Sequence, residues 1–192
     1  MTLLILGLVL FLGIHSARVF AEGPRTRFIA QRGENAWKGL YSAVSLLGLV
    51  LLVWGFGLAR QQPVVLWAPP TWARHLAAVL TLPAFVLLAA AYVPGNHIKA
   101  RLHHPMVLGI KVWAFAHLLV GRTLAAELLF AGFLVWAALS FRAARARDRA
   151  AGAVYPPGRR GPTVATAVLG IAAWAGFAAW GHGVVIGVRP FG

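Results

Sequence analysis

The sequence predicts an all-α membrane protein, a polytopic bundle of about six transmembrane helices. Of its 192 residues, 60% are hydrophobic and only 11% are charged, whereas soluble domains carry about a quarter charged residues. The apolar residues gather in six segments, and a membrane-spanning helix needs about 20 such residues. Most Lys and Arg residues lie between these segments. This composition excludes a water-soluble globule and a disordered chain.

Six segments have the character of a spanning helix. In chain order they are Thr2–Phe20, Gly39–Leu58, His75–Val93, Pro105–Val120, Thr123–Phe141 and Thr163–Ile186. The first has no Lys or Arg before its apolar run and no small-residue cleavage motif, so it is interpreted as a retained helix rather than a signal peptide. The fourth is the shortest, and merging or dropping it leaves five spans. No internal repeat is visible, and residues 1–192 are expected to form a single transmembrane domain.

The charge distribution predicts the orientation of the helices. The first, third and fifth connections hold twelve of the 18 Lys and Arg residues, and the opposite side holds four. By the positive-inside rule, both termini face away from the cytoplasm. Within the fifth connection, which begins at Arg142, the stretch Ala143–Pro162 is predicted to be a cytoplasmic linker that rests on anionic lipid. The chain has a net charge of +14, and membrane lipid is the expected partner of its basic residues. Nucleic acid is not an expected partner, because the sequence contains no recognition motif for it.

Several kinds of chemistry are excluded by what the sequence lacks. There is no cysteine, which removes disulfides, cysteine zinc sites, iron–sulfur clusters and thiolate nucleophiles. There is no P-loop, dinucleotide fingerprint, serine elbow or pair of carboxylates either. Ordinary hydrolase, kinase and dehydrogenase functions therefore have no support.

Ionisable side chains inside the predicted spans are the candidate functional residues, because they are costly in a bilayer and usually face the bundle interior. They are His15, Arg18, Lys111, His117 and Glu127, with His182 near the end of the sixth span. Histidines on different apolar helices suit a metal cofactor, and haem fits best. Neutral imidazoles ligate iron, small residues admit the macrocycle, and an interfacial arginine can meet a propionate. Copper or zinc on His97, His103 and His104 is the alternative metal site.

The first span carries a histidine close to a glycine. Gly13 removes side-chain bulk two residues before His15, which suits an axial ligand, and Arg18 follows at i+3 on the same helical face. Arg18 can then pair with an acidic cofactor group or snorkel to lipid phosphate. A structural alternative is a buried histidine that is hydrogen-bonded to the neighbouring Ser16.

The fourth span carries polar groups on two faces. Pro105 fits the first position of a helix, which puts His104 at its N-cap. Trp113 and His117 share one face at i and i+4. More polar groups are present than a purely structural helix needs, so this helix is predicted to lie near the centre of the bundle.

Glu127 is the only acidic residue within the predicted spans. It lies about one turn into the fifth span. Three roles are open to its carboxylate: it neutralises Lys111, orients a ligating histidine, or pairs with Arg122 at the interface.

These motifs together resemble the NnrU family of membrane proteins. The matching residues are Gly13–Ser16, Gly39–Gly48, Trp54–Gly57, His104–Pro105 and Trp113–Leu119, and the resemblance covers nearly the whole chain. NnrU proteins are bacterial inner-membrane proteins associated with denitrification and linked to the expression of nitrite and nitric oxide reductases. A distant relative, the plant 15-cis-zeta-carotene isomerase, is a haem b membrane enzyme that isomerises a cis double bond in a redox-dependent way.

The resemblance implies a haem b protein of the bacterial inner membrane, with His15 and His117 as the iron ligands. The charge distribution adds that both termini are periplasmic. Arg18, His104 and Trp113 complete the predicted cofactor-binding set. The implied partners are denitrification enzymes or a membrane electron donor. Whether the chain is an isomerase-like enzyme or a non-catalytic assembly or sensor partner stays open.

Two features bear on that ligand pair. Ala114 stands where the isomerase has a cysteine proposed as an alternative ligand. Counted from the cytoplasmic helix ends, His15 is about six residues deep and His117 about thirteen, a difference of about 10 Å at about 1.5 Å per residue. Unless the helices tilt or shift, His104 or His103 is the alternative partner of His15.

A second resemblance points to another class of enzyme. His104–Pro105 and the residues up to Gly109 are similar to the Arg-His-Pro motif of integral-membrane isoprenylcysteine and phospholipid methyltransferases, although His103 replaces the arginine. Those enzymes bind S-adenosylmethionine near a cytoplasmic helix end. S-adenosylmethionine is therefore the alternative cofactor.

Overall fold

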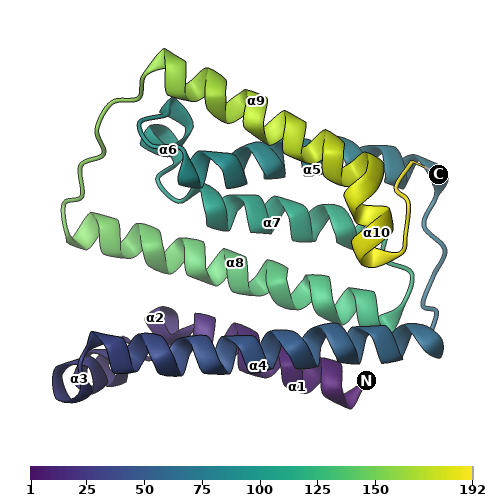
Figure 1. The fold of residues 1–192 in the computed structure, drawn as a ribbon, viewed down its shortest axis with the longest axis horizontal. Helices are drawn as coiled ribbons and strands as arrows, with labels where there is room; N and C mark the ends of the chain where they lie inside the picture. Colours follow the sequence, from purple (N-terminus) through teal and green to yellow (C-terminus); the bar gives the residue numbers. More distant parts are fainter. Residues whose placement is uncertain (192) are drawn as a thin grey trace. The chain divides into compact units, whose positions relative to one another are not determined.

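The computed structural model describes residues 1–191, which are helical along most of their length and contain no β-strand (Figure 1). The all-α fold is thereby confirmed. The helices are α1 (Thr2–His15), α2 (Ala17–Phe20), α3 (Glu22–Arg32), α4 (Glu34–Gln61), α5 (Thr71–Tyr92), α6 (His97–Leu102), α7 (Pro105–Leu118), α8 (Leu124–Ala150), α9 (Arg160–Gly176), the π-helical turn η1 (Phe177–Gly181) and α10 (His182–Ile186). The chain forms two compact units, unit 1 (1–68 with 121–143) and unit 2 (69–120 with 144–191).

All six predicted spans coincide with helices. Within residues 1–191, four helical runs are long and apolar enough to cross a membrane: α4, α5, α8 and the continuous run Arg160–Ile186. The other two, α1 and α7, are apolar helices of 14 residues each, about 21 Å long at about 1.5 Å per residue. The first predicted span is divided at Ser16, which separates α1 from α2.

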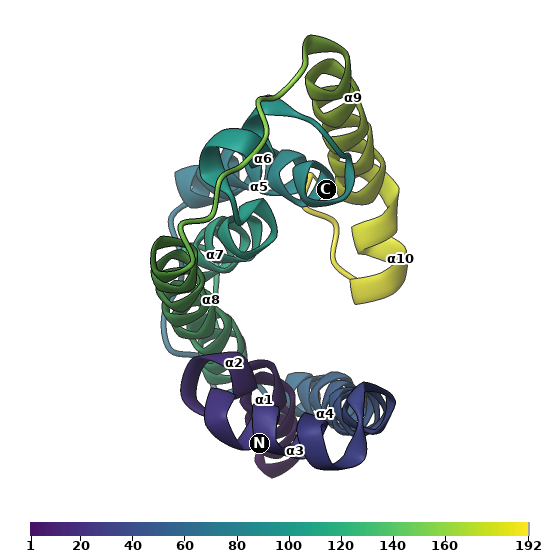
Figure 2. The same cartoon turned by 90° about the vertical axis from the view of Figure 1, so that its left-hand side faces the viewer.

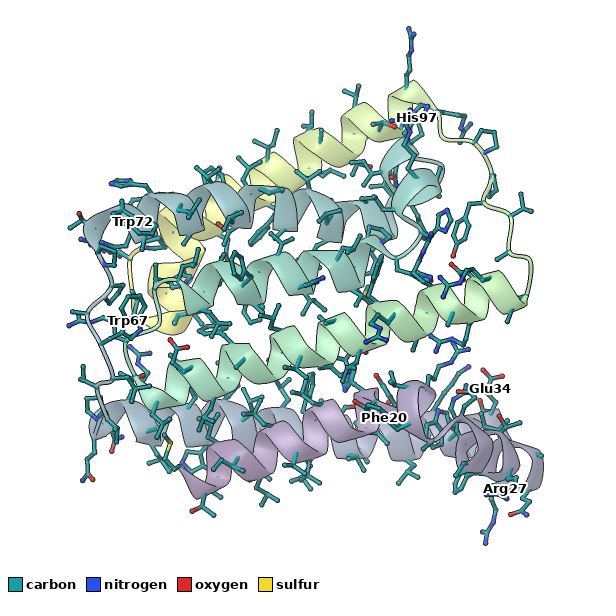
Figure 3. The ribbon with its side chains drawn as sticks, turned by 180° about the vertical axis from the view of Figure 1, so that it is seen from behind. Phe20, Arg27, Glu34, Trp67, Trp72 and His97 are labelled. Atoms are coloured by element: carbon teal, nitrogen blue, oxygen red, sulfur yellow. The ribbon has the colours of Figure 1, made fainter. Side chains whose placement is uncertain are left out.

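The exposed surface of these helices has the character of a lipid-facing surface. Val50 and Val53 of α4 are 58% and 62% exposed in the middle of the helix. Large aromatic side chains are exposed at helix ends, as Phe20 at the end of α2 and Trp72 near the start of α5 (Figure 3). Aromatic residues at the ends of apolar helices are typical of membrane interfaces. The chain is therefore a membrane protein.

Two of the predicted connections contain more helix than the sequence analysis expected. The first connection forms α3, which begins at Glu22 and ends before Gly33, where φ is +85°. The fifth connection begins later than predicted, because α8 continues through Ala150 and leaves only residues 151–159 as the linker. Alanine and arginine are strong helix formers, so the helix continues beyond its apolar part.

In unit 1, α1 packs closely against α4 (Figure 1). Lipid supplies no hydrophobic force between helices, so tight association needs small residues that let backbones approach. Gly7 faces the backbone of Leu52, and Gly55 faces the backbone of Leu4. A Cβ on Gly48 would lie 2.7 Å from the backbone nitrogen of Phe11. The glycines therefore determine how closely these two helices can approach.

In unit 2, α5 packs against both α7 and α9 (Figure 2). Gly109 of α7 and Gly170 of α9 face α5, and a Cβ on Gly170 would lie 2.6 Å from the Cα of Val86. The indole Nε1 of Trp174 on α9 donates a hydrogen bond to Thr81 Oγ1 on α5 at 3.1 Å. Unit 2 thus uses the same small-residue packing, with one polar bond between helices added.

Gly55→Leu is expected to destabilise unit 1, because a side chain there meets the backbone of Leu4 and forces α1 away from α4. Overpacking of this kind costs about 1–3 kcal/mol, which a lower unfolding temperature in detergent would report. Gly57→Leu is the matched control, since a Cβ at Gly57 has no neighbour within 4 Å. Equal stability of the two variants would contradict the packing of α1 on α4.

Candidate functional site

His15 is the last residue of α1 and lies among aromatic side chains from three helices of unit 1. Its ring centroid is 4.2 Å from that of Phe11, 5.1 Å from that of Tyr41 on α4 and 6.1 Å from that of Trp136 on α8. Its Nδ1 is 2.7 Å from the carbonyl oxygen of Phe11, one turn earlier. The imidazole is thereby fixed in one orientation.

The bond to Phe11 also determines the tautomer of His15. A carbonyl oxygen only accepts, so Nδ1 carries the proton and donates it, and in the neutral ring Nε2 holds the lone pair. This is the form in which histidine ligates a metal. The predicted alternative, a bond from His15 to Ser16, is wrong, since the Ser16 hydroxyl donates to the carbonyl oxygen of Leu12 at 2.7 Å.

Two polar atoms without partners lie on α8, the helix that brings Trp136 to His15. Ser140 is one turn beyond Trp136 on this helix. Trp136 Nε1 and Ser140 Oγ are both buried and have no hydrogen-bond partner within residues 1–191. Buried polar atoms in native proteins nearly always have a partner, so a water molecule or a bound group is the expected partner of each.

Arg18 lies in α2, close to the predicted interface. Its guanidinium Nε is 3.6 Å from Glu22 Oε2, and the side chain is 57% exposed. The Arg18 side chain is therefore paired with Glu22, the first residue of α3, and remains accessible to solvent or lipid. Its predicted contact with a cofactor propionate stays a prediction.

His117 of α7 in unit 2 has the same arrangement as His15 in unit 1. Its Nδ1 donates to the carbonyl oxygen of Trp113, one turn earlier, at 2.8 Å. The two rings are 5.0 Å apart between centroids, as their shared helical face predicts. Nε2 is again the nitrogen that carries the lone pair in the neutral ring.

His104 lies at the N-cap of α7, directly before Pro105, as predicted. Its environment differs from that of His15 and His117. Its Nε2 is 2.8 Å from Asp148 Oδ2, and a carboxylate only accepts, so Nε2 donates the hydrogen bond. The Tyr155 hydroxyl donates to the same oxygen at 3.1 Å. His104 therefore uses for Asp148 the nitrogen that His15 and His117 keep as an acceptor.

His103 extends this cluster. Its ring stacks on that of Tyr155, with centroids 3.9 Å apart and planes inclined by 10°, and Arg145 donates to its Nδ1. His103 has a φ of +67°, the only positive φ of a non-glycine residue within 1–191, and such a backbone is strained. We call His103, His104, Arg145, Asp148 and Tyr155 the Asp148 cluster.

The Asp148 cluster joins the turn between α6 and α7 to the end of α8 and to the linker 151–159. Burial, together with the neighbouring Asp148 carboxylate, raises the pKa of Tyr155 above its ordinary value. No sequence motif pointed to Asp148, which is 44 residues from His104. One signal was available, since Asp148 is the only acidic residue of unit 2.

The remaining candidates do not gather into a metal centre. His97 lies at the start of α6 (Figure 3). Its Nδ1 is hydrogen-bonded to Thr163 Oγ1 at 2.8 Å, and it does not join His103 and His104 in a metal-binding group. Within residues 1–191, no three His, Asp or Glu side chains are grouped to hold a metal ion. Glu127 makes no ion pair with Arg122, and its Oε1 is buried without a hydrogen-bond partner in this part of the chain.

Comparisons with known proteins give one match. A family model described as NnrU protein matches residues 3–190. No curated protein and no solved structure matches the chain. The matched range includes every candidate residue of the two units described above.

Asp148→Ala is expected to loosen the linker 151–159, because it removes the acceptor shared by His104 and Tyr155. Limited trypsin digestion in detergent should then cleave at Arg159 and Arg160 several-fold faster than in the unchanged protein. Tyr155→Phe, which removes one of the two bonds and keeps a ring to stack on His103, should have a smaller effect. Identical digestion of all three proteins would show that the cluster does not hold the linker.

Proposed function

The chain belongs to the NnrU family, and on that premise we propose that it is a membrane protein that binds haem b through His15 and His117. One observation carries the proposal. Both imidazoles donate Nδ1–H to the carbonyl oxygen one turn earlier in their own helix, at 2.7 and 2.8 Å. This bond orients the ring and leaves Nε2 as the nitrogen that can ligate iron.

The surroundings of His15 support the fit of a large, partly polar cofactor. Trp136 and Ser140 each have a buried polar atom without a partner within residues 1–191, and a bound group with polar substituents would supply those partners. The aromatic rings of Phe11, Tyr41 and Trp136 offer apolar contact area beside the same histidine. When bound, haem supplies a redox-active iron; the chain holds it and restricts the access of water.

The proposed role follows the family. NnrU proteins are associated with denitrification, so the proposal places this haem protein in the bacterial inner membrane, with denitrification enzymes or a membrane electron donor as partners. Isomerase-like activity and a non-catalytic assembly or sensor role are both compatible with haem binding. Ala114, which replaces a cysteine of the isomerase, removes the ligand that would support switching between two ligation states.

A membrane methyltransferase is the second candidate, and it rests on the segment His104–Pro105. His104 Nε2 is bonded to Asp148 within the chain, which leaves this candidate without a supporting contact. Calorimetric titration with S-adenosylmethionine tests it, and heat of binding from a haem-free preparation would favour it over haem.

Haem binding predicts a b-type spectrum. Protein expressed with a haem precursor and extracted in mild detergent should give a pyridine haemochrome of about one haem per chain. His15→Ala and His117→Ala should each lose most of the Soret absorbance or shift the reduced-minus-oxidised spectrum, because each removes an iron ligand. His104→Ala should retain the spectrum, since its Nε2 is engaged by Asp148.

His75→Ala is the matched control, because His75 is an exposed histidine near the start of α5. Its spectrum should equal that of the unchanged protein. A spectrum lost in His104→Ala and retained in His117→Ala would refute the proposed ligand pair. No Soret band in any preparation would refute haem binding.

The proposed orientation is testable without background, because the chain has no native cysteine. Val154→Cys lies in the linker 151–159 and Gln62→Cys follows α4, and both positions are exposed. A membrane-impermeant maleimide added to spheroplasts should label the cysteine at 62 and should label that at 154 only after the membrane is permeabilised. The reverse pattern would place both termini in the cytoplasm.

A further inference from the structure

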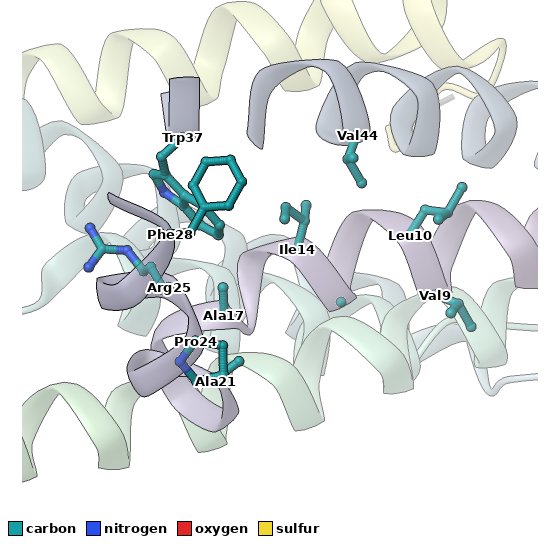
Figure 4. Close-up of a pocket in the computed structure, with 11 residues that line it drawn as sticks. Val9, Leu10, Ile14, Ala17, Ala21, Pro24, Arg25, Phe28, Trp37 and Val44 are labelled. Atoms are coloured by element: carbon teal, nitrogen blue, oxygen red, sulfur yellow. The ribbon is translucent and has the colours of Figure 1, made fainter. Parts of the chain in front are cut away.

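An open groove runs along the outer surface of α1 in unit 1 (Figure 4). Side chains from α1, α2, α3 and α4 line it, and its lining is almost entirely apolar. The lining residues are Val9, Leu10, Gly13, Ile14, Ala17, Ala21, Pro24, Arg25, Phe28, Trp37 and Val44. His15 is not among them, so the groove is distinct from the proposed haem site.

One end of the groove differs from the rest. Arg25, Phe28 and Trp37 gather there, while Val9 and Leu10 lie at the other end (Figure 4). The Arg25 guanidinium lies 5.7 Å from the centre of the Trp37 ring, and its Nη1 is 3.2 Å from Glu22 Oε1. The Arg25 side chain is only 23% exposed. A cation is thus held in place over an aromatic ring at the polar end of an apolar groove.

The dimensions and chemistry of the groove suit an acyl chain. From Val9 to Ala17 the groove follows about 12 Å of helix at about 1.5 Å per residue, and one leaflet of the hydrocarbon core is about 15 Å deep. A straight hydrocarbon chain can lie in such a groove without leaving a polar group unpaired. Gly13 keeps the floor open, since a Cβ there has no neighbour within 4 Å.

The charge at the polar end selects the headgroup. Around α3 the chain carries five basic residues, Arg18, Arg25, Arg27, Arg32 and Lys38, against two acidic ones, Glu22 and Glu34. Basic residues beside a membrane surface attract anionic lipids. We propose that the groove binds one anionic glycerophospholipid, with an acyl chain along α1 and the phosphate at Arg25. Neither the groove nor its charge depends on haem.

Native mass spectrometry of the full chain tests this site. Protein in detergent is incubated with phosphatidylglycerol or phosphatidylcholine of equal chain length, and the lipid retained per chain is measured. One phosphatidylglycerol should be retained, and phosphatidylcholine should be retained less. Arg25→Gln should reduce retained phosphatidylglycerol about fivefold, whereas Arg27→Gln, which removes the same charge from an exposed position on α3 (Figure 3), should not.

Gly13→Leu tests the apolar part, because the new side chain fills the groove without meeting the backbone. It should abolish retention, while Gly57→Leu, at an equally open glycine that does not line the groove, should leave it unchanged. Unfolding temperatures close to that of the unchanged protein exclude a general loss of structure.

Three outcomes would overturn the proposal. Equal retention of the two lipids would remove the role of charge, and equal effects of Arg25→Gln and Arg27→Gln would remove the role of the position. Retention that survives Gly13→Leu would place the lipid elsewhere. A protein that passes this test and shows no haem would keep the lipid site and lose the proposed function, so the two can fail independently.

Discussion

The close approach of α1 to α4 at Gly7, Gly48 and Gly55 is the contact on which unit 1 depends. In a bilayer the lipid tails are as apolar as the helices, so the hydrophobic effect does not drive one helix against another. The 14-residue helix α1 is held against α4 by van der Waals contact between closely spaced backbones. The same contact brings His15 to Tyr41. A looser crossing would separate that ring pair and widen the groove on the other side of α1. Packing and both proposed sites therefore share one constraint.

The chain has seven histidines. Three of them, His15, His104 and His117, were candidate iron ligands, and they differ in which ring nitrogen donates a hydrogen bond and in what accepts it. His15 and His117 donate to a backbone carbonyl oxygen of their own helix. This bond needs no side chain from another helix. His104 donates to a carboxylate brought from α8. In the first arrangement the neutral ring carries its lone pair on Nε2, whereas in the second Nε2 donates to Asp148. The proposed choice of iron ligands therefore rests on local helix geometry as well as on the family resemblance.

Hydrophobic runs predicted the helices well, because a bilayer permits few alternatives to a helix for an apolar segment. The charged residues between the apolar runs did not predict which connections are helical. Gly33 and the acidic Glu22 mark the ends of α3 in the usual way, yet the basic residues between them resemble a solvated loop. The pairing of His104 with Asp148 was not predicted, since it depends on how α6, α7 and the end of α8 come together. Local signals fix the helices, and the polar sites depend on contacts distant in sequence.

Positive charge serves this chain in two physically different ways. In the Asp148 cluster, Arg145 donates a hydrogen bond to His103, and Asp148 accepts hydrogen bonds from His104 and Tyr155. These bonds hold the turn that contains the strained backbone of His103. At the groove, Arg25 has an acidic neighbour in Glu22 but also lies over Trp37 at the end of an apolar channel. The excess of basic residues around α3 leaves that end able to take a further anion. The positive-inside rule predicts on which side basic residues gather, whereas the contacts of Arg145 and Arg25 depend on the particular side chains around each of them.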